Sequence, residues 1–288
     1  MNLERTSSFF MEYKNTESQF AVTEGHYHDA YEIMYYKRAE LDFFIKDNKY
    51  HIKDGDIVFI RAYELHRSIY HTSPHYERYV INFKKEYILP LLKASGALPL
   101  FEQLEKSPVR RFSTTLKHRN ELESVMQEIY KQYQKSGETR ELLLKVNFLF
   151  LLAKLDGLRK HTAPQQGDCK EEQVKRLIQA IDKSYAQALT LDELATQMNL
   201  NKYHMCHIFK EITGFTIIEY LQYRRVIAAQ KLLVSTEKSI DFIGSECGFG
   251  NLHHFYRVFK TIAGNTPARY RKEKQTPARL PVFETDDL

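Results

Sequence analysis

The sequence predicts an α+β protein with an antiparallel β unit in its N-terminal half and an entirely helical C-terminal half. Three observations lead to this expectation. Short segments rich in aromatic and β-branched residues fill positions 20–83, apolar residues then recur at helical spacing over about 84–160, and one helical pattern occurs twice after residue 170. With 288 residues, the chain is long enough for two domains.

The composition is that of a globular protein, with 43% hydrophobic and 27% charged residues and a formal net charge of +5. That charge permits a polyanionic partner without requiring one. Cys169, Cys206 and Cys247 form no CxxC pair, which argues against a disulfide framework. Neither a membrane-spanning apolar run nor a signal-peptide core is visible, so we expect a cytoplasmic protein with no membrane partner.

The β unit is expected from four segments separated by the turn-forming KDN and KDG sequences: YEIMYY, LDFFIK, YHIKDGDIVFI and RYVINF. Next, Leu122, Val125, Met126 and Ile129 define one face of an amphipathic helix, and GETRELLLKVNFLFLLAKLDGLRK predicts a second. The polar stretch HTAPQQGDCK is typical of a linker. We therefore expect domains at 1–160 and 171–275, a linker at 161–170 and a C-terminal tail at 276–288.

The repeated pattern pairs LDELATQMNLNKYHMCHIFKEITGFT (191–216, the first copy) with IDFIGSECGFGNLHHFYRVFKTIAGNT (240–266, the second copy). Ala195 aligns with Gly244. Both are small, as is needed where the first helix of each copy crosses the second closely. Each copy has the parts of a helix-turn-helix. Its turn requires a positive φ, which Gly248 or Gly250 supplies in the second copy and Asn199 or Asn201 tolerates in the first. Asn201 and Asn251 are the expected caps of the second helices.

Further signals mark helix ends and a connector. The segment 216–234 is expected to form one helix, about 28 Å long, that could hold both copies against successive major-groove faces about 34 Å apart. The expected N-terminal caps are Thr190 with Glu193, Thr216 with Glu219, and Thr266 before Pro267, and the expected C-terminal ends are Gly214 and Gly264.

The second helix of each copy leaves one stripe of side chains for solvent, at the place where a recognition helix meets base edges. The simpler interpretation is a helical bundle with a solvated basic face, but duplication, caps and turn residues together favour DNA binding. The expected base-reading residues are Lys202, Tyr203, Cys206, His207, Leu252, His253, Tyr256 and Arg257. The expected phosphate-binding residues are Lys210, Arg224, Arg225, Lys260, Arg269 and Arg271.

About 100 of these residues resemble the AraC/XylS family of bacterial transcription regulators. The resemblance rests on LTLDELATQMNLNKYHMCHIFKEITGFTIIEYLQYRRVIAAQKLL and on SIDFIGSECGFGNLHHFYRVFKTIAGNTPARYR. The first copy departs at His207, where the family usually has Arg, and at Cys206, where it is usually polar. This departure suggests that base specificity depends mainly on the second copy.

The segments GHYHDAYEIMYYKRAELDF and IKDGDIVFIRAYELHRSIY resemble the sensor domain of that family. The resemblance implies a cupin-like antiparallel β-barrel, or jelly roll, that binds a small effector. It also implies that helices at about 116–156 form a homodimer, the alternative being that they only cover the barrel.

The resemblance implies an effector in the barrel, for which our candidate residues are His26, His28, Glu32, Tyr36 and His66, and aromatic residues of the barrel could stack on a sugar ring. His26, His28, Glu32 and His66 also match the ligand set of metal-binding cupins, since alternation on a strand would put both early His on one face. We favour no metal and no other cofactor, and these four residues are the ligands if a metal is present. No phosphate-binding glycine loop or nucleophile elbow occurs, so we expect no enzyme and no catalytic residue.

The resulting hypothesis is a sequence-specific transcription regulator, an activator by resemblance, that binds double-stranded promoter DNA under control of an effector. RNA polymerase is then an expected partner. Two alternatives stay open: a metal-dependent cupin enzyme with a DNA-binding tail, and a DNA binder that needs no ligand.

Overall fold

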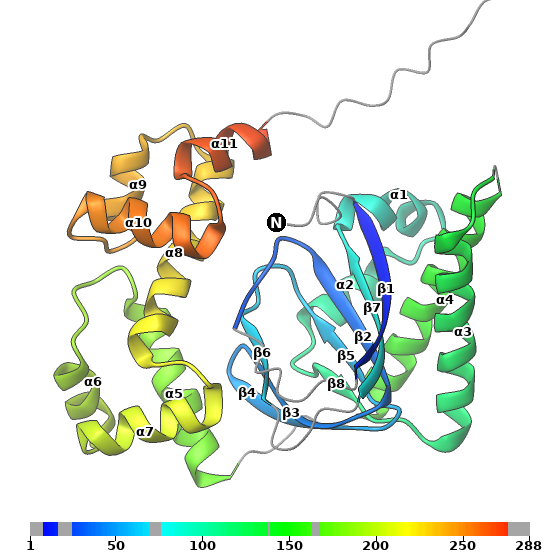
Figure 1. Ribbon diagram of the computed structural model, residues 1–288, viewed down its shortest axis with the longest axis horizontal. Coiled ribbons are helices and arrows are strands. Elements are labelled where there is room, and N and C mark those ends of the chain that lie inside the picture. Colours follow the sequence, from blue (N-terminus) through cyan, green and yellow to red (C-terminus); the bar gives the residue numbers. More distant parts are fainter. Residues whose placement is uncertain (1–7, 17–24, 70–75, 138, 163–167, 276–288) are drawn as a thin grey trace, which may run out of the picture. The chain divides into compact units, whose positions relative to one another are not determined.

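A computed structural model describes residues 8–16, 25–69, 76–137, 139–162 and 168–275 (Figure 1). By backbone contacts the chain divides into two compact units, one with 2–175 and 208–214 and one with 176–207 and 215–288. This division cuts through two helices, so the expected domain boundaries stay a prediction. Residues 163–167 of the expected linker and the expected tail at 276–288 lie outside the described residues.

The N-terminal half contains two antiparallel sheets, as the sequence predicted. One sheet has the order β1-β7-β2-β5-β8 and the other β4-β3-β6. Among the described strands the two sheets do not close into a single hydrogen-bonded ring. The strands are β1 (Phe9–Thr16), β2 (Tyr31–Arg38), β3 (Glu40–Ile45), β4 (Asn48–Lys53), β5 (Ile57–Ile60), β6 (His66–Ile69), β7 (Tyr76–Phe83) and β8 (Arg111–Phe112).

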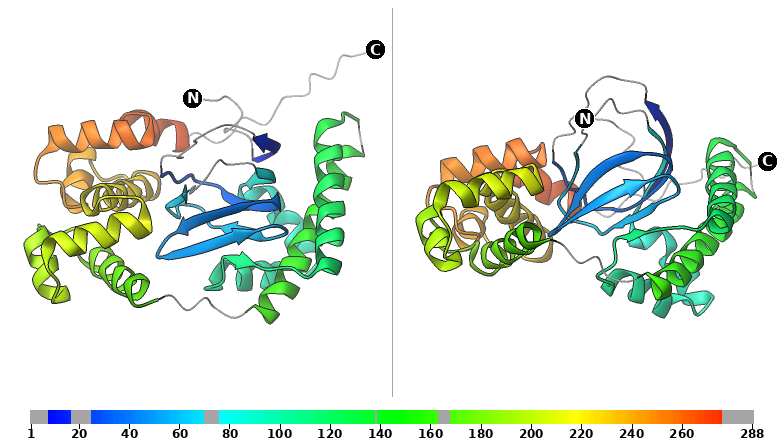
Figure 2. Two further views of the ribbon diagram at one scale, coloured as in Figure 1. Left: turned by 60° about the horizontal axis from the view of Figure 1, so that its bottom comes forward. Right: turned by 90° about the horizontal axis from the view of Figure 1, so that it is seen from below.

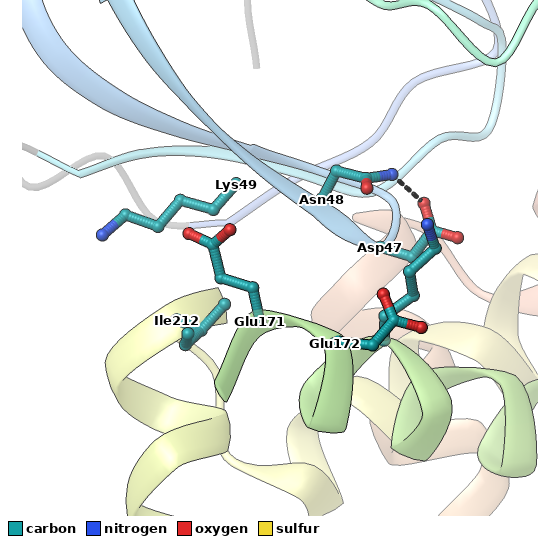
Figure 3. A pocket seen from close by; sticks show the side chains of 7 residues that line it. Asp47, Asn48, Lys49, Glu171, Glu172 and Ile212 are labelled. Carbon is teal, nitrogen blue, oxygen red and sulfur yellow. Dashed lines mark hydrogen bonds between the residues drawn. The ribbon is translucent and has the colours of Figure 1, made fainter. Parts of the chain in front are cut away.

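Two of these strands lie outside the predicted range of 20–83. β1 begins at Phe9 and pairs along its whole length with β7, so that Phe9 and Met11 reach the core. β8 is only two residues long and borders β5. The predicted KDN turn does join β3 to β4, where Lys46 has a φ of 57° and Asn48 Nδ2 donates to Asp47 Oδ1 at 2.6 Å (Figure 3).

Both faces of the five-stranded sheet are buried, which explains why its strands read as continuous apolar runs. Ile33 and Tyr35 of β2 face a cluster formed with helices, whereas Met34 and Tyr36 face a second cluster shared with the three-stranded sheet. The side chains of neighbouring strand residues point to opposite faces, so one strand serves both cores. This second cluster, here called the inner cluster, contains the following residues of the three-stranded sheet: Leu41, Phe43, Ile45, Tyr50 and Ile52.

Four helices follow β7, with β8 between the second and the third: α1 (Lys85–Ala94), α2 (Leu98–Lys106), α3 (Leu116–Gln134) and α4 (Arg140–His161). The last two lie side by side next to the five-stranded sheet (Figures 1 and 2). The predicted face of α3 is buried, as Leu122 and Met126 show. No helix in the described ranges is long and apolar enough to cross a membrane.

The remaining helices are α5 (Cys169–Ser184), α6 (Leu191–Met198), α7 (Lys202–Thr213), α8 (Ile217–Ser235), α9 (Ile240–Glu246), α10 (Leu252–Ala263) and α11 (Pro267–Gln275). The sequence located their ends well because capping is a local signal. Thr190 and Thr216 each form a complete capping box with the Glu three residues later. Gly214 and Gly264 have φ of 75° and 76°, the left-handed conformation that ends a helix.

Helix α9 crosses α10 closely at Gly244. A Cβ at this position would lie 2.7 Å from Cδ1 of Phe255, whose ring is fully buried. In the first copy, Ala195 takes the place of Gly244 and Met205 the place of Phe255. The residue on the first helix is therefore larger, and the residue that faces it is narrower. Both copies therefore fill the space where the two helices cross, the first with Ala and Met and the second with Gly and Phe.

We predict that Gly244→Ala lowers the free energy of unfolding by about 1 kcal/mol. Overpacking costs about 1–3 kcal/mol, which outweighs the gain of at most about 1 kcal/mol from replacing a helical Gly. Urea denaturation followed by circular dichroism measures the change. Gly250→Ala is the matched control, since nothing lies within 4 Å of its Cβ position. The double variant with Phe255→Met should recover part of the loss, and additive losses would contradict this account of the crossing.

Candidate functional site

The turn between the two helices of each copy is held by one residue with positive φ. In the first copy this residue is Asn199, at 53°, and in the second it is Gly248, at 89°. Asn201 and Gly250, the other candidates from the sequence, do not have positive φ. A Cβ on Gly248 would lie 2.8 Å from the carbonyl oxygens of both Tyr185 and Ala186, so the turn also needs glycine for space.

Both recognition helices begin at the predicted asparagine caps. Asn201 Oδ1 accepts from the backbone N–H of Tyr203 at 2.9 Å, and Asn251 Oδ1 accepts from that of His254 at 3.0 Å. Each cap fixes where the first helical turn starts. It thereby fixes which side chains of that turn face solvent.

On α10, the second recognition helix, Phe255, Val258 and Phe259 are buried, and the opposite face is exposed. The predicted base-reading residues His253, Tyr256 and Arg257 all lie on that exposed face. Leu252 is only half-buried and lies at the start of the same stripe. The helix therefore presents donors, acceptors and an apolar side chain together on one surface.

Two side chains of this stripe are also bonded within the second copy. The Tyr256 hydroxyl donates to Asp241 Oδ1 at 3.1 Å, and desolvation together with this hydrogen bond raises the pKa of Tyr256. Arg257 Nη2 donates to His254 Nδ1 at 3.2 Å. The first bond ties α10 to α9 and holds the tyrosine ring in one orientation, which the sequence did not reveal.

On α7, the first recognition helix, Tyr203 is 84% exposed and His207 is exposed, while Lys202 and Cys206 are partly buried. Lys202 Nζ lies 2.9 Å from Asp192 Oδ2, and the hydrogen bond to that carboxylate raises the pKa of the lysine. The surface of α7 thus lacks the arginine that α10 presents.

Three of the predicted phosphate-binding arginines bind groups inside the helical region. Arg225 donates to the carbonyl oxygens of Tyr185 and Gln187 at 2.7 and 2.9 Å, and burial lowers its pKa. Arg271 donates to those of Leu233 and Lys238 at 3.2 and 2.6 Å.

The third of them, Arg224, pairs with Asp182. Lys210, Lys260 and Arg269 are exposed instead, and Arg269 Nε lies 2.7 Å from Glu273 Oε1. These three cations have their side chains at the surface of the helical region.

The polar residues predicted for the sensor come together at the start of β2. His26 bridges to His66, each backbone N–H donating to the other's carbonyl oxygen at 3.0 Å. Their Nε2 atoms are 3.1 Å apart. Glu32 Oε2 lies 3.3 Å from Nε2 of both His28 and His66. The four residues therefore form one group, here called the His–Glu cluster.

Alternation along a strand does not produce this cluster. Residues 25–28 do not form a strand, and only His26 takes part in an isolated bridge. Burial would raise the pKa of the Glu32 carboxyl, but the hydrogen bonds and charges of His28 and His66 outweigh burial and hold it well below its usual range. An ionised carboxylate facing imidazoles suits a cationic or hydrogen-bonding ligand.

Tyr36, the fifth predicted sensor residue, lies in the inner apolar cluster and has a cation beside it. Its register partner on β7 is Arg78, whose Nη1 donates to the Tyr36 hydroxyl at 3.3 Å. The guanidinium also lies 4.9 Å from the ring centre of Tyr76. The sequence reasoning missed Arg78 because one arginine in a strand carries no sign of which sheet face it takes.

Comparison with known proteins agrees with both halves. A family model described as a helix-turn-helix domain matches residues 194–273, and one described as an AraC-like ligand binding domain matches residues 13–152. The first match lies in the C-terminal half of the chain and the second in the N-terminal half, apart from its last few residues.

Three curated relatives illustrate the similarity. The HTH-type transcriptional activator RhaR of Enterobacter is 27% identical over 255 residues, or 88% of each chain. The bifunctional transcriptional activator/DNA repair enzyme AdaA of Bacillus subtilis is 42% identical over 101 residues, 35% of this chain and 48% of that protein. The melibiose operon regulatory protein of Escherichia coli is 32% identical over 102 residues, 35% of this chain and 34% of that protein. The chain thus matches only about half the length of AdaA.

Proposed function

Since this chain belongs to the AraC/XylS family of transcription regulators, we propose that it activates transcription from a promoter that both recognition helices bind. The observation that carries the proposal is the exposed stripe of α10. Arg257 lies on this stripe, opposite the buried face of the helix. Arginine can donate two hydrogen bonds to one guanine, the commonest specific contact in the major groove. RNA polymerase is the proposed partner of the bound activator.

We propose that the two recognition helices contribute unequally. α10 offers Arg257 and Tyr256, and α7 offers Tyr203 and His207. Lys210, Lys260 and Arg269 would bind phosphates because their charges are exposed. Arg224, Arg225 and Arg271 support that surface from inside, by holding helix ends together through ionic and carbonyl contacts.

The proposed homodimer would form through α4. Leu142, Val146 and Phe150 recur every four residues on this helix and are 63%, 50% and 49% exposed. The opposite face, including Leu144, Phe148 and Leu151, is buried in the core. A helix with apolar residues on two faces, one of them exposed, suits a second copy of the same helix.

The proposed effector is a small molecule bound inside the β-sheet half, and a sugar is one candidate. Support for a sugar comes from the relative named for a melibiose operon. The polar groups available are the His–Glu cluster and Tyr36, to which the structure adds Arg78. No catalytic step is proposed, since the relative named as a repair enzyme matches this chain over only 101 residues.

We predict that Arg257→Ala weakens binding to a duplex selected by the wild-type protein by about 5- to 150-fold, equivalent to about 1–3 kcal/mol. Binding to random DNA of equal length should change little, because that binding depends on phosphate contacts. Fluorescence anisotropy titrations of both duplexes measure the two effects. An equal loss on both would show that Arg257 reads no base.

Lys260→Ala should weaken binding to the selected and the random duplex by the same factor. The slope of log affinity against log salt concentration should become shallower by about 1, since one phosphate contact is lost. The measurement repeats the titrations at four salt concentrations. A slope equal to that of the wild type would refute the phosphate role of this lysine.

Val146→Glu should raise the dissociation constant of the dimer by more than about 100-fold. Each symmetric interface would bury the new charge twice and lose apolar burial of about 1.5–3 kcal/mol per side chain. Sedimentation equilibrium measures the constant. Ser124→Glu on the exposed face of α3 is the matched control and should leave it unchanged. A monomeric wild-type protein would contradict the proposed dimer.

A further inference from the structure

A hydrogen bond between the two helices of the second copy limits what one of its base-reading residues can recognise. The hydroxyl of Tyr256 on α10 donates to Oδ1 of Asp241 on α9 at 3.1 Å. Asp241 is exposed, and Tyr256 is 38% exposed on the stripe that is proposed to face DNA. The hydrogen bond therefore lies at the surface where bases would be read.

The direction of this hydrogen bond follows from the two groups that form it. An ionised carboxylate has lone pairs and no hydrogen, so it can only accept, and the Tyr256 hydroxyl has to donate. Desolvation and the hydrogen bond to Asp241 raise the pKa of Tyr256, so the hydroxyl keeps the proton that it donates. A tyrosine hydroxyl has one hydrogen. Once Asp241 accepts it, Tyr256 has only lone pairs to offer to DNA.

The tyrosine ring also has a second contact that limits its rotation. Its centroid lies 5.5 Å from that of Phe255, at an interplanar angle of 63°. The Phe255 ring is fully buried and lies against Gly244 of α9. The aromatic contact and the hydrogen bond together set the position of the phenolic oxygen before DNA is bound.

The first copy has an aspartate at the same position, with a different partner. Oδ2 of Asp192, which aligns with Asp241, lies 2.9 Å from Nζ of Lys202 on α7. In both copies this position of the first helix therefore contacts the recognition helix. The consequence differs, because an ammonium group bound to one carboxylate keeps two more hydrogens to donate, whereas the tyrosine keeps none.

We propose that Asp241 is a positioning residue that makes Tyr256 a hydrogen-bond acceptor toward DNA, so that Tyr256 recognises the amino group of an adenine or a cytosine. In the major groove the donors on base edges are adenine N6 and cytosine N4, whereas purine N7, guanine O6 and thymine O4 only accept. The proposal rests on the DNA-binding function proposed above and specifies one contact within it. Arg257, which only donates, would read groups of the opposite kind.

The test begins with duplexes selected from random sequence by the full-length wild-type protein and by Tyr256→Phe. The base pair at which only the wild type shows a preference is the pair that Tyr256 contacts. Two modified duplexes are then prepared at this pair. In one, the adenine or cytosine lacks its amino group, and in the other, the purine has carbon in place of N7.

We expect loss of the amino group to weaken wild-type binding by about 3- to 10-fold, the range of one hydrogen bond, and loss of N7 to have no effect. Fluorescence anisotropy measures both affinities, and their ratio is the discrimination between the two duplexes. Tyr256→Phe should show no discrimination, since it lacks the phenolic oxygen. This comparison also corrects for any effect of the modified bases on the duplex itself.

Variants of Asp241 test the positioning role. Asp241→Ala frees the tyrosine hydrogen and should abolish the discrimination. Asp241→Asn keeps an oxygen that can accept and should retain the discrimination, which separates the hydrogen bond from the charge of the aspartate. Glu246→Ala is the matched control, because Glu246 lies on the same helix α9 and its carboxylate lies 2.9 Å from Lys238 Nζ. This control should discriminate as the wild type does.

Three outcomes would overturn the proposal: no base pair whose preference depends on Tyr256, a wild-type loss on removal of N7 rather than of the amino group, or full discrimination in Asp241→Ala. Circular dichroism and binding to random DNA show that each variant is folded. A wild-type protein that binds selected and random duplexes equally would refute the proposed DNA recognition as well. A protein that selects a duplex but ignores the amino group would refute only the role of Asp241.

Discussion

Burial of three apolar side chains on α10 decides which face of this helix reaches solvent. Phe255, Val258 and Phe259 face the core, and α9 crosses α10 so closely that a Cβ on Gly244 would meet the Phe255 ring at 2.7 Å. Successive residues advance by about 100° around a helix, so a shift of one position would bury Tyr256 and Arg257 or turn them aside. The cap by Asn251 and the turn at Gly248 also determine which face of α10 is exposed, because they set where the helix begins.

The two copies keep this constraint and differ in what they expose. Asp192 and Asp241 occupy aligned positions on the first helices, and each bonds to the recognition helix of its own copy. The partner is Lys202 in the first copy and Tyr256 in the second, which lie at different positions along the helix. The same acidic anchor therefore fixes a charged side chain in one copy and an aromatic one in the other. The exposed surfaces of the two recognition helices therefore differ in charge and in shape.

Features encoded by neighbouring residues could be predicted from the sequence, and features that depend on distant partners could not. The capping boxes, the asparagine caps and the glycine ends all involve residues within four positions of each other, and the structure confirms them. Nothing near Arg225 or Arg271 indicates that a helix end elsewhere in the chain supplies carbonyl acceptors. The four residues of the His–Glu cluster do lie together, but the chain brings them together through a bridge between segments rather than by strand alternation, and their role stays a prediction.

The inner cluster of the β-sheet half has buried polar groups close to its apolar side chains. Met34, Phe43 and Ile52 are among the apolar side chains that fill the space between the sheets. Glu32, His66 and Arg78 are nevertheless buried. Buried charges cost several kcal/mol each unless they are paired, and an apolar core of the same volume would avoid that cost. Each of these groups has a partner inside the protein: Glu32 lies 3.3 Å from His28 and His66, and Arg78 donates to the Tyr36 hydroxyl, so pairing offsets part of the cost of burial.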